Sequence, residues 1–237
     1  MKNLYISSLK KATGKTTIAA SLLATMQSLS YYTGYFKVIQ SGLNSSKFAT
    51  DELYIKNMDS NIISYTSYLF DSPCCPLIGA FEAGIGKINI QKIVNDFKTN
   101  INDTEFNIIE GSNSISSPID DKLTEIDLIK ALEASIVLVV DTKKDTLDEL
   151  ISGINYIHSN GITLEGIIIN SYNIHSEKTE EKYFPSLVKE FSKEKIIGCF
   201  PYLEDYESIE AGTLIAETLN HFNVGDIFGL EIAKLKV

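Results

Sequence analysis

Apolar residues gather along the chain in short runs that have the length of β-strands. These runs occupy residues 3–7, 33–39, 105–109, 135–140, 164–169 and 195–200. The third, fourth and fifth runs are almost continuously apolar, which is typical of strands buried on both faces of a parallel sheet. We therefore predict a largely parallel sheet built from these six segments.

Between the runs, other segments repeat apolar residues at spacings of three and four, the period of an amphipathic helix. The helical segments are residues 15–30, 88–99, 123–133, 146–159, 179–192 and 207–222. Such alternation predicts an α/β fold of three layers, in which a mostly parallel, twisted sheet carries helices on both faces. No repeat or Pro/Gly-rich linker divides the chain, so we predict one domain, 1–237. Ligands of such folds bind beyond the carboxyl ends of the strands.

The loop after the first strand ends in Thr-Gly-Lys-Thr, the closing half of a phosphate-binding loop, which makes the fold one of P-loop NTPase type. Gly14 lets the backbone approach phosphate oxygens, Lys15 neutralises the terminal phosphates, and the Thr16 hydroxyl is offered to Mg²⁺. Free N–H groups at the following helix start complete the anion site. The predicted phosphate-binding residues are Ala12, Thr13, Gly14, Lys15, Thr16 and Thr17. An ordinary turn with a surface lysine is the alternative.

The opening half of this loop is irregular, because Leu9 stands where the usual pattern has glycine. Lys10 and Lys11 add positive charge beside the loop. They are either solvated lysines or further phosphate contacts.

The charge balance limits the partners of the chain. Thirty-one acidic residues against 21 basic ones give a formal charge of −10, so nucleic acid and anionic membrane surfaces are poor partners. No apolar run reaches membrane-spanning length, and the N-terminal segment lacks the features of a signal peptide. Three cysteines form neither a disulfide framework nor a metal-ligand spacing. We therefore expect a cytoplasmic protein.

Three further segments carry a family resemblance. They are Gly34-Tyr35-Phe36-Lys37-Val38-Ile39-Gln40-Ser41-Gly42, residues 72–84 (SPCCPLIGAFEAG), and residues 106–119 with Ile109-Glu110-Gly111. With the phosphate loop, they make the chain resemble the dethiobiotin synthetase family, ATP-dependent P-loop enzymes of biotin synthesis. The similarity runs from residue 3 to about residue 215, in register and with small gaps.

The resemblance implies three catalytic residues. Lys37 would lie across the cleft from Lys15 and stabilise a carbamate and the transferred phosphoryl group, because phosphoryl transfer needs a positive clamp. Ser41 would hydrogen-bond the carbamate or an amine of the substrate. Taken alone, Lys37 could instead extend to the surface from an apolar strand.

The resemblance also implies a metal site and a nucleotide site. Thr16, Asp51 and Glu110 would give Mg²⁺ an oxygen ligand set, completed by water and phosphate oxygens. Gly111, Asn170, Pro201 and Tyr202 join the ATP-binding residues, with the Asn170 amide reading adenine. Taken alone, Asp51 favours the role of a helix N-terminal acid, because its neighbours are helical, and Asn170 is equally a turn residue. Glu110 favours a functional role, because a carboxylate that ends a buried strand is costly unless it binds something.

The implied activity is that of an ATP-dependent cyclo-ligase. ATP and Mg²⁺ would drive carboxylation and ring closure of 7,8-diaminopelargonate to dethiobiotin, through a carbamate and a carbamic-phosphoric anhydride. The expected partners are this small-molecule diamine, CO₂ or bicarbonate, and ATP. A homodimer is expected because the family forms one across its active sites.

Departures from the family pattern keep alternatives open. Ser8, Lys11 and Ala12 replace a glycine, a threonine and an acid of the family loop, and Ser112, Asn113 and Ser114 replace its later glycine pair. Acids in the segment 145–149 would repel a substrate carboxylate, although Lys143 and Lys144 could compensate. Three interpretations therefore remain open. The chain is a dethiobiotin synthetase, or it is a non-catalytic domain. The third possibility is a related nucleotide-binding ATPase or regulatory domain that has another substrate or partner and uses Lys10 at a dimer interface. The tail 219–237 packs on the sheet edge or on a partner.

Overall fold

Seven strands form one sheet in the computed structural model of the chain, which describes residues 2–42, 49–203 and 208–229. The strands are β1 (Lys2–Ser8), β2 (Thr33–Ser41), β3 (Ile63–Phe70), β4 (Phe106–Glu110), β5 (Ser135–Asp141), β6 (Leu164–Tyr172) and β7 (Ile196–Pro201). Their order is β3-β2-β4-β1-β5-β6-β7, and neighbouring strands pair in parallel. The predicted α/β fold class is confirmed.

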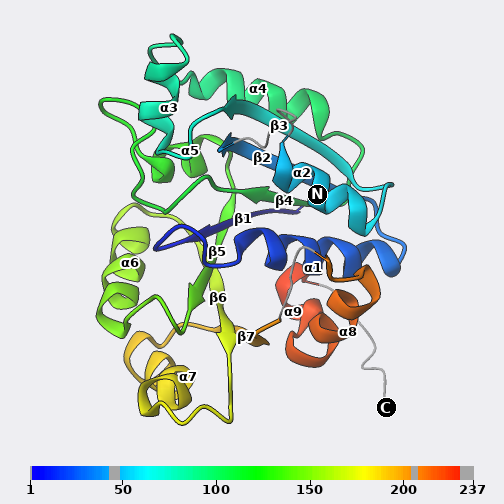
Figure 1. Cartoon of the computed structure of the whole chain (residues 1–237), viewed down its shortest axis with the longest axis vertical. Helices are drawn as coiled ribbons and strands as arrows, with labels where there is room; N and C mark the ends of the chain where they lie inside the picture. Colours follow the sequence, from blue (N-terminus) through cyan, green and yellow to red (C-terminus); the bar gives the residue numbers. More distant parts are fainter. Residues whose placement is uncertain (1, 43–48, 204–207, 230–237) are drawn as a thin grey trace.

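Helices cover both faces of this sheet (Figure 1). They bury two separate apolar layers. One layer packs under α1 (Lys15–Ser28), α2 (Thr50–Met58), α8 (Ala211–His221) and α9 (Val224–Phe228). The other packs under α3 (Pro76–Glu82), α4 (Ile90–Asn100), α5 (Glu125–Ala131), α6 (Leu147–Ser159) and α7 (Thr179–Ser192). The result is the predicted three-layer arrangement. In the described ranges, no helix has both the length and the apolar character needed to cross a membrane.

The sequence patterns missed the strand β3 and the short helices α3 and α9. β3 is an edge strand that pairs with β2 alone, and most of its residues are only half-buried. It therefore carries serine, threonine and tyrosine instead of a continuous apolar run. Helix α8 begins at Ala211, later than the expected start at residue 207, which lies outside the described residues.

The described part of the tail packs on the sheet edge, as one of the two expectations had it: Phe222 forms an antiparallel bridge with Gly198 of the edge strand β7, and its ring lies 5.4 Å from that of Phe200. The tail also reaches further across the sheet. The Phe228 ring contacts the Phe106 ring of the inner strand β4, with ring centroids 4.9 Å apart. The Lys2 ammonium also donates to the Ile227 carbonyl at 2.6 Å. Residues 219–229 thus extend the helical layer over the middle of the sheet, and 230–237 lie outside the described residues.

The register of the sheet decides which polar residues meet. Lys37 of β2 lies beside Glu110 of β4, and Asp141 of β5 lies beside Asn170 of β6. Strand β1 runs between β4 and β5 and leads directly into the phosphate loop. All five strands are parallel, so their carboxyl ends bring these residues to one edge of the sheet.

We expect Ile108→Ala to lower the free energy of unfolding by about 2–5 kcal/mol, because it removes a fully buried side chain from β4. Ile78→Ala, at a side chain that is 49% exposed on α3, should change it by only about 0.5 kcal/mol. Urea unfolding of the two variants measures both values. Equal losses would contradict this assignment of the core.

Candidate active site

The phosphate loop is fixed by a close contact with β6. Gly14 has φ 87°, a left-handed conformation that favours glycine, and a Cβ at this position would lie 2.2 Å from the Asn170 side-chain nitrogen. The Asn170 amide in turn donates to the Thr13 carbonyl at 2.9 Å. Glycine is thus required at position 14 for two independent reasons. Ala12 is also left-handed, with φ 58°, where its Cβ makes the conformation unfavourable.

Lys15 begins α1 and is buried beside the loop. Its ammonium donates to the Ser8 hydroxyl at 3.0 Å and to the Asn113 carbonyl at 2.8 Å. Burial and then the positive charge of Lys37 lower the pKa of Lys15. Among the described residues this ammonium has no direct carboxylate partner, which suits it to an anionic ligand. Ser8, which stands where the family has glycine, supplies one of its acceptors.

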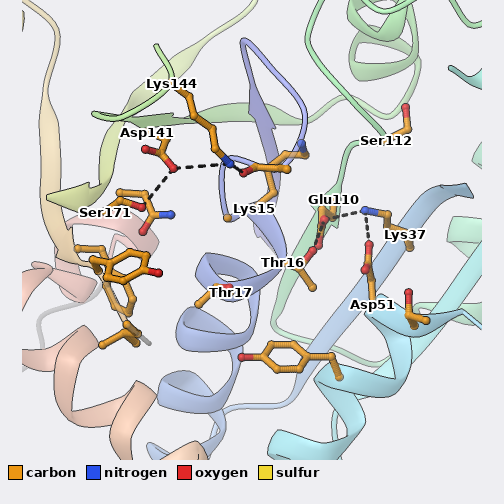
Figure 2. A pocket seen from close by; sticks show the side chains of 18 of the residues that line it. Lys15, Thr16, Thr17, Lys37, Asp51, Glu110, Ser112, Asp141, Lys144 and Ser171 are labelled. Carbon is orange, nitrogen blue, oxygen red and sulfur yellow. Dashed lines mark hydrogen bonds and ion pairs between the residues drawn. The ribbon is translucent and has the colours of Figure 1, made fainter. Parts of the chain in front are cut away.

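A cluster of charged side chains lies on one side of the loop. The Lys37 ammonium contacts Glu110 Oε1 at 2.6 Å and Asp51 Oδ2 at 2.7 Å, and donates to the Gly111 carbonyl at 3.2 Å. The Thr16 hydroxyl donates to the same Glu110 oxygen at 2.8 Å. Figure 2 shows these polar groups directed toward one another from β2, β4, α1 and α2.

Lys37 is 4% exposed, so the alternative of a lysine that extends to the surface is wrong. Burial alone would lower the pKa of Lys37, but the charges of Asp51 and Glu110 raise it above the ordinary lysine value. Lys37 is therefore a charged group that faces two carboxylates. Asp51 also lies in the first turn of α2, so the helix-terminal interpretation and the cluster interpretation hold together.

The chemistry of the cluster fits Mg²⁺. The Thr16 hydroxyl and the carboxylates of Asp51 and Glu110 line one cavity and offer only oxygen ligands, as Mg²⁺ prefers. Two carboxylates face a single ammonium, which leaves an excess of negative charge for a second cation. No group of three or more His, Cys, Asp or Glu residues suited to a metal occurs in the described parts of the chain. Phosphate oxygens and water would have to complete the coordination.

The cavity has a volume of about 850 Å³ and lies at the carboxyl edge of the sheet. Most of the predicted site residues line it: Ala12, Gly14, Lys15, Thr16, Thr17, Lys37, Asp51, Glu110, Asn170, Pro201 and Tyr202. Thr13, Ser41 and Gly111 do not belong to this lining. The Ser41 hydroxyl is buried and has no hydrogen-bond partner among the described residues, which leave out its neighbours 43–48.

The side of the cavity formed by β6 and β7 is more apolar. Phe200, Pro201, Tyr202 and Leu203 line it together with Asn170. One N–H of the Asn170 amide is used by the loop, which leaves its carbonyl oxygen and a second N–H available. Such a surface suits a flat ring that carries polar edge groups.

The acids at the start of α6 have local partners. Glu149 accepts hydrogen bonds from the Lys10 ammonium at 2.6 Å and from the Thr146 backbone at 3.0 Å. The contact with Lys10 is the main reason that the pKa of Glu149 falls to about 2. The Asp145 carboxylate accepts from the Asp141 backbone at 2.8 Å. Glu149 thus caps α6 and pairs with a lysine, while Asp145 binds the end of β5, and neither acid lines the cavity.

Three residues near the cluster were missed by the sequence analysis. The Tyr35 hydroxyl donates to Glu110 Oε2 at 2.8 Å, and Glu125 accepts from the loop after β4. Asp141 lines the cavity and accepts from the Ser171 hydroxyl at 3.2 Å. Only for Asp141 does the sequence pattern indicate a functional role, because this carboxylate ends an apolar strand. The local sequence predicts a core aromatic residue at Tyr35 and an ordinary acid in the first turn of a helix at Glu125.

Comparison with known proteins shows the family to which this chain belongs. A family model described as an AAA domain matches residues 2–210. ATP-dependent dethiobiotin synthetase of Clostridium botulinum (strain Alaska E43) is 30% identical over 181 residues, which cover 73% of this chain and 79% of that enzyme. The chain belongs to the dethiobiotin synthetase family. The dethiobiotin synthetase of Caldicellulosiruptor saccharolyticus is 28% identical over 218 residues, 88% of each chain.

Solved structures share the fold of this dethiobiotin synthetase family member. The MinD cell division protein of Aquifex aeolicus superposes with a TM-score of 0.59 at 14% identity, over 98% of this chain and 99% of that one. A nucleotide-binding protein in complex with ADP from Archaeoglobus fulgidus gives 0.53 at 11% identity, over 91% and 87%. At this identity the likeness concerns the fold alone.

Tyr35→Phe should lower the free energy of unfolding by about 1–3 kcal/mol, because it leaves a buried oxygen of Glu110 without its donor. Tyr32→Phe, at a ring that is 69% exposed, should stay within about 0.5 kcal/mol of the unmodified protein. Chemical denaturation compares the two. A Tyr35→Phe value as small as that of the control would remove the hydroxyl from the support of Glu110.

Proposed function

We propose that the chain is an ATP-dependent dethiobiotin synthetase, a cyclo-ligase that carboxylates 7,8-diaminopelargonate and closes its ureido ring. The observation that carries the proposal is the convergence of Lys37, Glu110, Asp51 and Thr16 beside Lys15 in one cavity. Membership of the dethiobiotin synthetase family supplies the reaction to which this arrangement is matched.

The reaction requires positioning and charge neutralisation. One amine of the substrate attacks CO₂ and loses a proton to give a carbamate. A carbamate oxygen attacks the terminal phosphorus of ATP, ADP leaves, and a carbamic-phosphoric anhydride forms. The second amine attacks the carbonyl carbon and loses a proton, the bond to the phosphate oxygen breaks, and inorganic phosphate leaves with the ring closed. Negative charge accumulates at the transferred group, where fixed positive charges stabilise it most.

Two lysines would supply that charge. Lys15, at the start of α1, would contact the terminal phosphates together with the free N–H groups of the helix. Lys37 would stabilise the carbamate and the transferred phosphoryl group from the opposite side of the cleft. The raised pKa of Lys37 keeps it charged for this role. Ser41, at the end of β2, would hold the carbamate or a substrate amine through its hydroxyl.

Thr16, Asp51 and Glu110 would hold Mg²⁺, and Asn170, Pro201 and Tyr202 would hold the adenine of ATP. When bound, Mg²⁺ supplies positive charge to the phosphate oxygens. Tyr35 and Lys37 keep the Glu110 carboxylate in place for this site through contacts of 2.8 Å and 2.6 Å. Thr13 and Gly111 would contribute to nucleotide binding through the backbone geometry that they impose on the two loops.

We further propose that the protein is a single domain that acts in the cytoplasm, and that it forms a homodimer, as the family resemblance implies. The regulatory-ATPase alternative assigns Lys10 to a dimer interface. In the structure, the Lys10 ammonium instead contacts Glu149 and the Lys144 carbonyl of its own chain, each at 2.6 Å. That pairing gives the alternative no support.

The test of the function is ADP release from ATP, Mg²⁺ and bicarbonate, with and without 7,8-diaminopelargonate. We expect strong stimulation by the diamine and a ureido product in mass spectrometry. ATP binding without stimulation would reject the biotin-pathway substrate. Hydrolysis that depends on dimer formation and not on a diamine would favour the regulatory ATPase, and no ATP binding at millimolar concentration would favour a non-catalytic domain.

Lys37→Ala should reduce turnover at least about 10²-fold, because it removes a positive group at the place where charge develops. Nucleotide affinity should change little, since Lys15 and the helix start remain. Lys37→Gln repeats the measurement with a side chain that still hydrogen-bonds, and circular dichroism checks that both variants fold. Equal losses of turnover and nucleotide affinity would remove Lys37 from its catalytic role.

A further inference from the structure

Glu125 is a fully buried carboxylate that lies outside the cavity. It is the first residue of α5, which packs on the face of the sheet opposite to α1. Its side chain reaches the carboxyl ends of two neighbouring strands. Both strands lead into loops of the phosphate site, so the position of Glu125 bears on both.

Neutral donors from these two strand ends surround the Glu125 carboxylate. Oε1 accepts from the Ser7 hydroxyl of β1 at 3.1 Å. Oε2 accepts from the Ser112 backbone at 3.2 Å, the Ser112 hydroxyl at 3.0 Å and the Asn113 backbone at 3.4 Å. Such donors are what a buried carboxylate needs in place of water. Glu125 therefore ties the end of β1 to the loop after β4.

Asn113 connects this carboxylate to Lys15. Its backbone N–H points to Glu125, and its carbonyl accepts from the Lys15 ammonium at 2.8 Å. The Ser8 hydroxyl contacts the same carbonyl at 3.0 Å and accepts from Lys15 at 3.0 Å. The Asn113 backbone thus lies between a fixed anion on one side and the lysine of the phosphate loop on the other.

Gly111 permits this arrangement. A Cβ at position 111 would lie 2.0 Å from Glu125 Oε1 and 3.0 Å from the Tyr5 ring. Neither the buried carboxylate nor the fully buried ring has room to withdraw. The absent side chain lets the backbone pass directly over the carboxylate, which brings Ser112 and Asn113 within hydrogen-bond distance.

We propose that Glu125 is a positioning residue for Lys15: through the Asn113 backbone and Ser7, it fixes the acceptors that aim the Lys15 ammonium at the terminal phosphates of the nucleotide. The proposal rests on the nucleotide site described under the proposed function. Glu125 then affects the binding of the β- and γ-phosphates of the nucleotide and has no effect on the binding of its base.

The experiment compares the affinities for ATP and AMP, because AMP lacks the phosphates that Lys15 would contact. Calorimetry with Mg²⁺ measures ATP, and ligand-observed NMR measures AMP into the millimolar range. Glu125→Ala should weaken ATP binding about tenfold, the scale of one charge-assisted contact, and leave AMP within about twofold. Glu125→Gln should have an intermediate effect, because the amide oxygen still accepts hydrogen bonds but the amide nitrogen cannot.

Asp127→Asn is the matched control on the same helix. The Asp127 carboxylate accepts from the Thr124 backbone at 2.9 Å and caps α5, and among the described residues it makes no hydrogen bond to Ser112 or Asn113. This variant should lower the Tm and leave the ratio of ATP to AMP affinity unchanged. If Glu125→Ala does not fold, Glu125→Gln provides the same comparison.

The outcomes separate this inference from the proposed function. Failure of the unmodified protein to bind ATP would reject the nucleotide site itself. ATP binding by the unmodified protein, with the same ATP to AMP ratio in the Glu125 variants, would overturn the positioning role alone. An equal fall of that ratio in Asp127→Asn would also overturn it, because the effect would then belong to the stability of α5.

Discussion

The buried contact between Lys37 and Glu110 is the constraint on which the rest of the site depends. Lys37 lies in β2 and Glu110 ends β4, and both are inner strands of the sheet. A charged side chain buried there is costly unless it is paired and hydrogen-bonded. Every neighbour reduces that penalty: Tyr35 binds the second oxygen of Glu110, Thr16 binds the first, and Asp51 adds a second carboxylate to Lys37. The position of α2 and the start of α1 are thus linked to one ion pair.

The phosphate loop also depends on side-chain contacts from other parts of the chain. Ser8 replaces a glycine of the family loop, and Ala12 adopts a left-handed conformation without being glycine. Side-chain contacts hold the backbone at both positions. The Ser8 hydroxyl lies between Lys15 and the Asn113 carbonyl, while the Lys144 ammonium donates to the Ala12 carbonyl. An irregular loop sequence therefore accompanies an ordered loop, because contacts from the loops after β4 and β5 hold its backbone.

The sequence was sufficient for the fold class and for residues whose role follows from their place at a strand end. Glu110 was predicted in this way, whereas Lys15 was predicted from the phosphate-loop motif and Asn170 from the family resemblance. All three line the cavity, because parallel strands bring their carboxyl ends to one edge of the sheet. β3 escaped because an edge strand need not be apolar. Glu125 and Tyr35 escaped because their partners are far away in the sequence, and nothing in the local pattern distinguishes them from a helix acid and a core aromatic residue.

The contact between Gly14 and Asn170 joins the two halves of the cavity into one rigid unit. The Asn170 amide, on the proposed base side, touches the backbone of the phosphate loop, with no room for a single added carbon atom at position 14. In the proposed nucleotide site, a larger residue at position 170 that favoured a different base would displace the phosphate loop. Base preference and phosphate affinity would then not be independent traits, and an evolutionary change in one would require an accompanying change in the other.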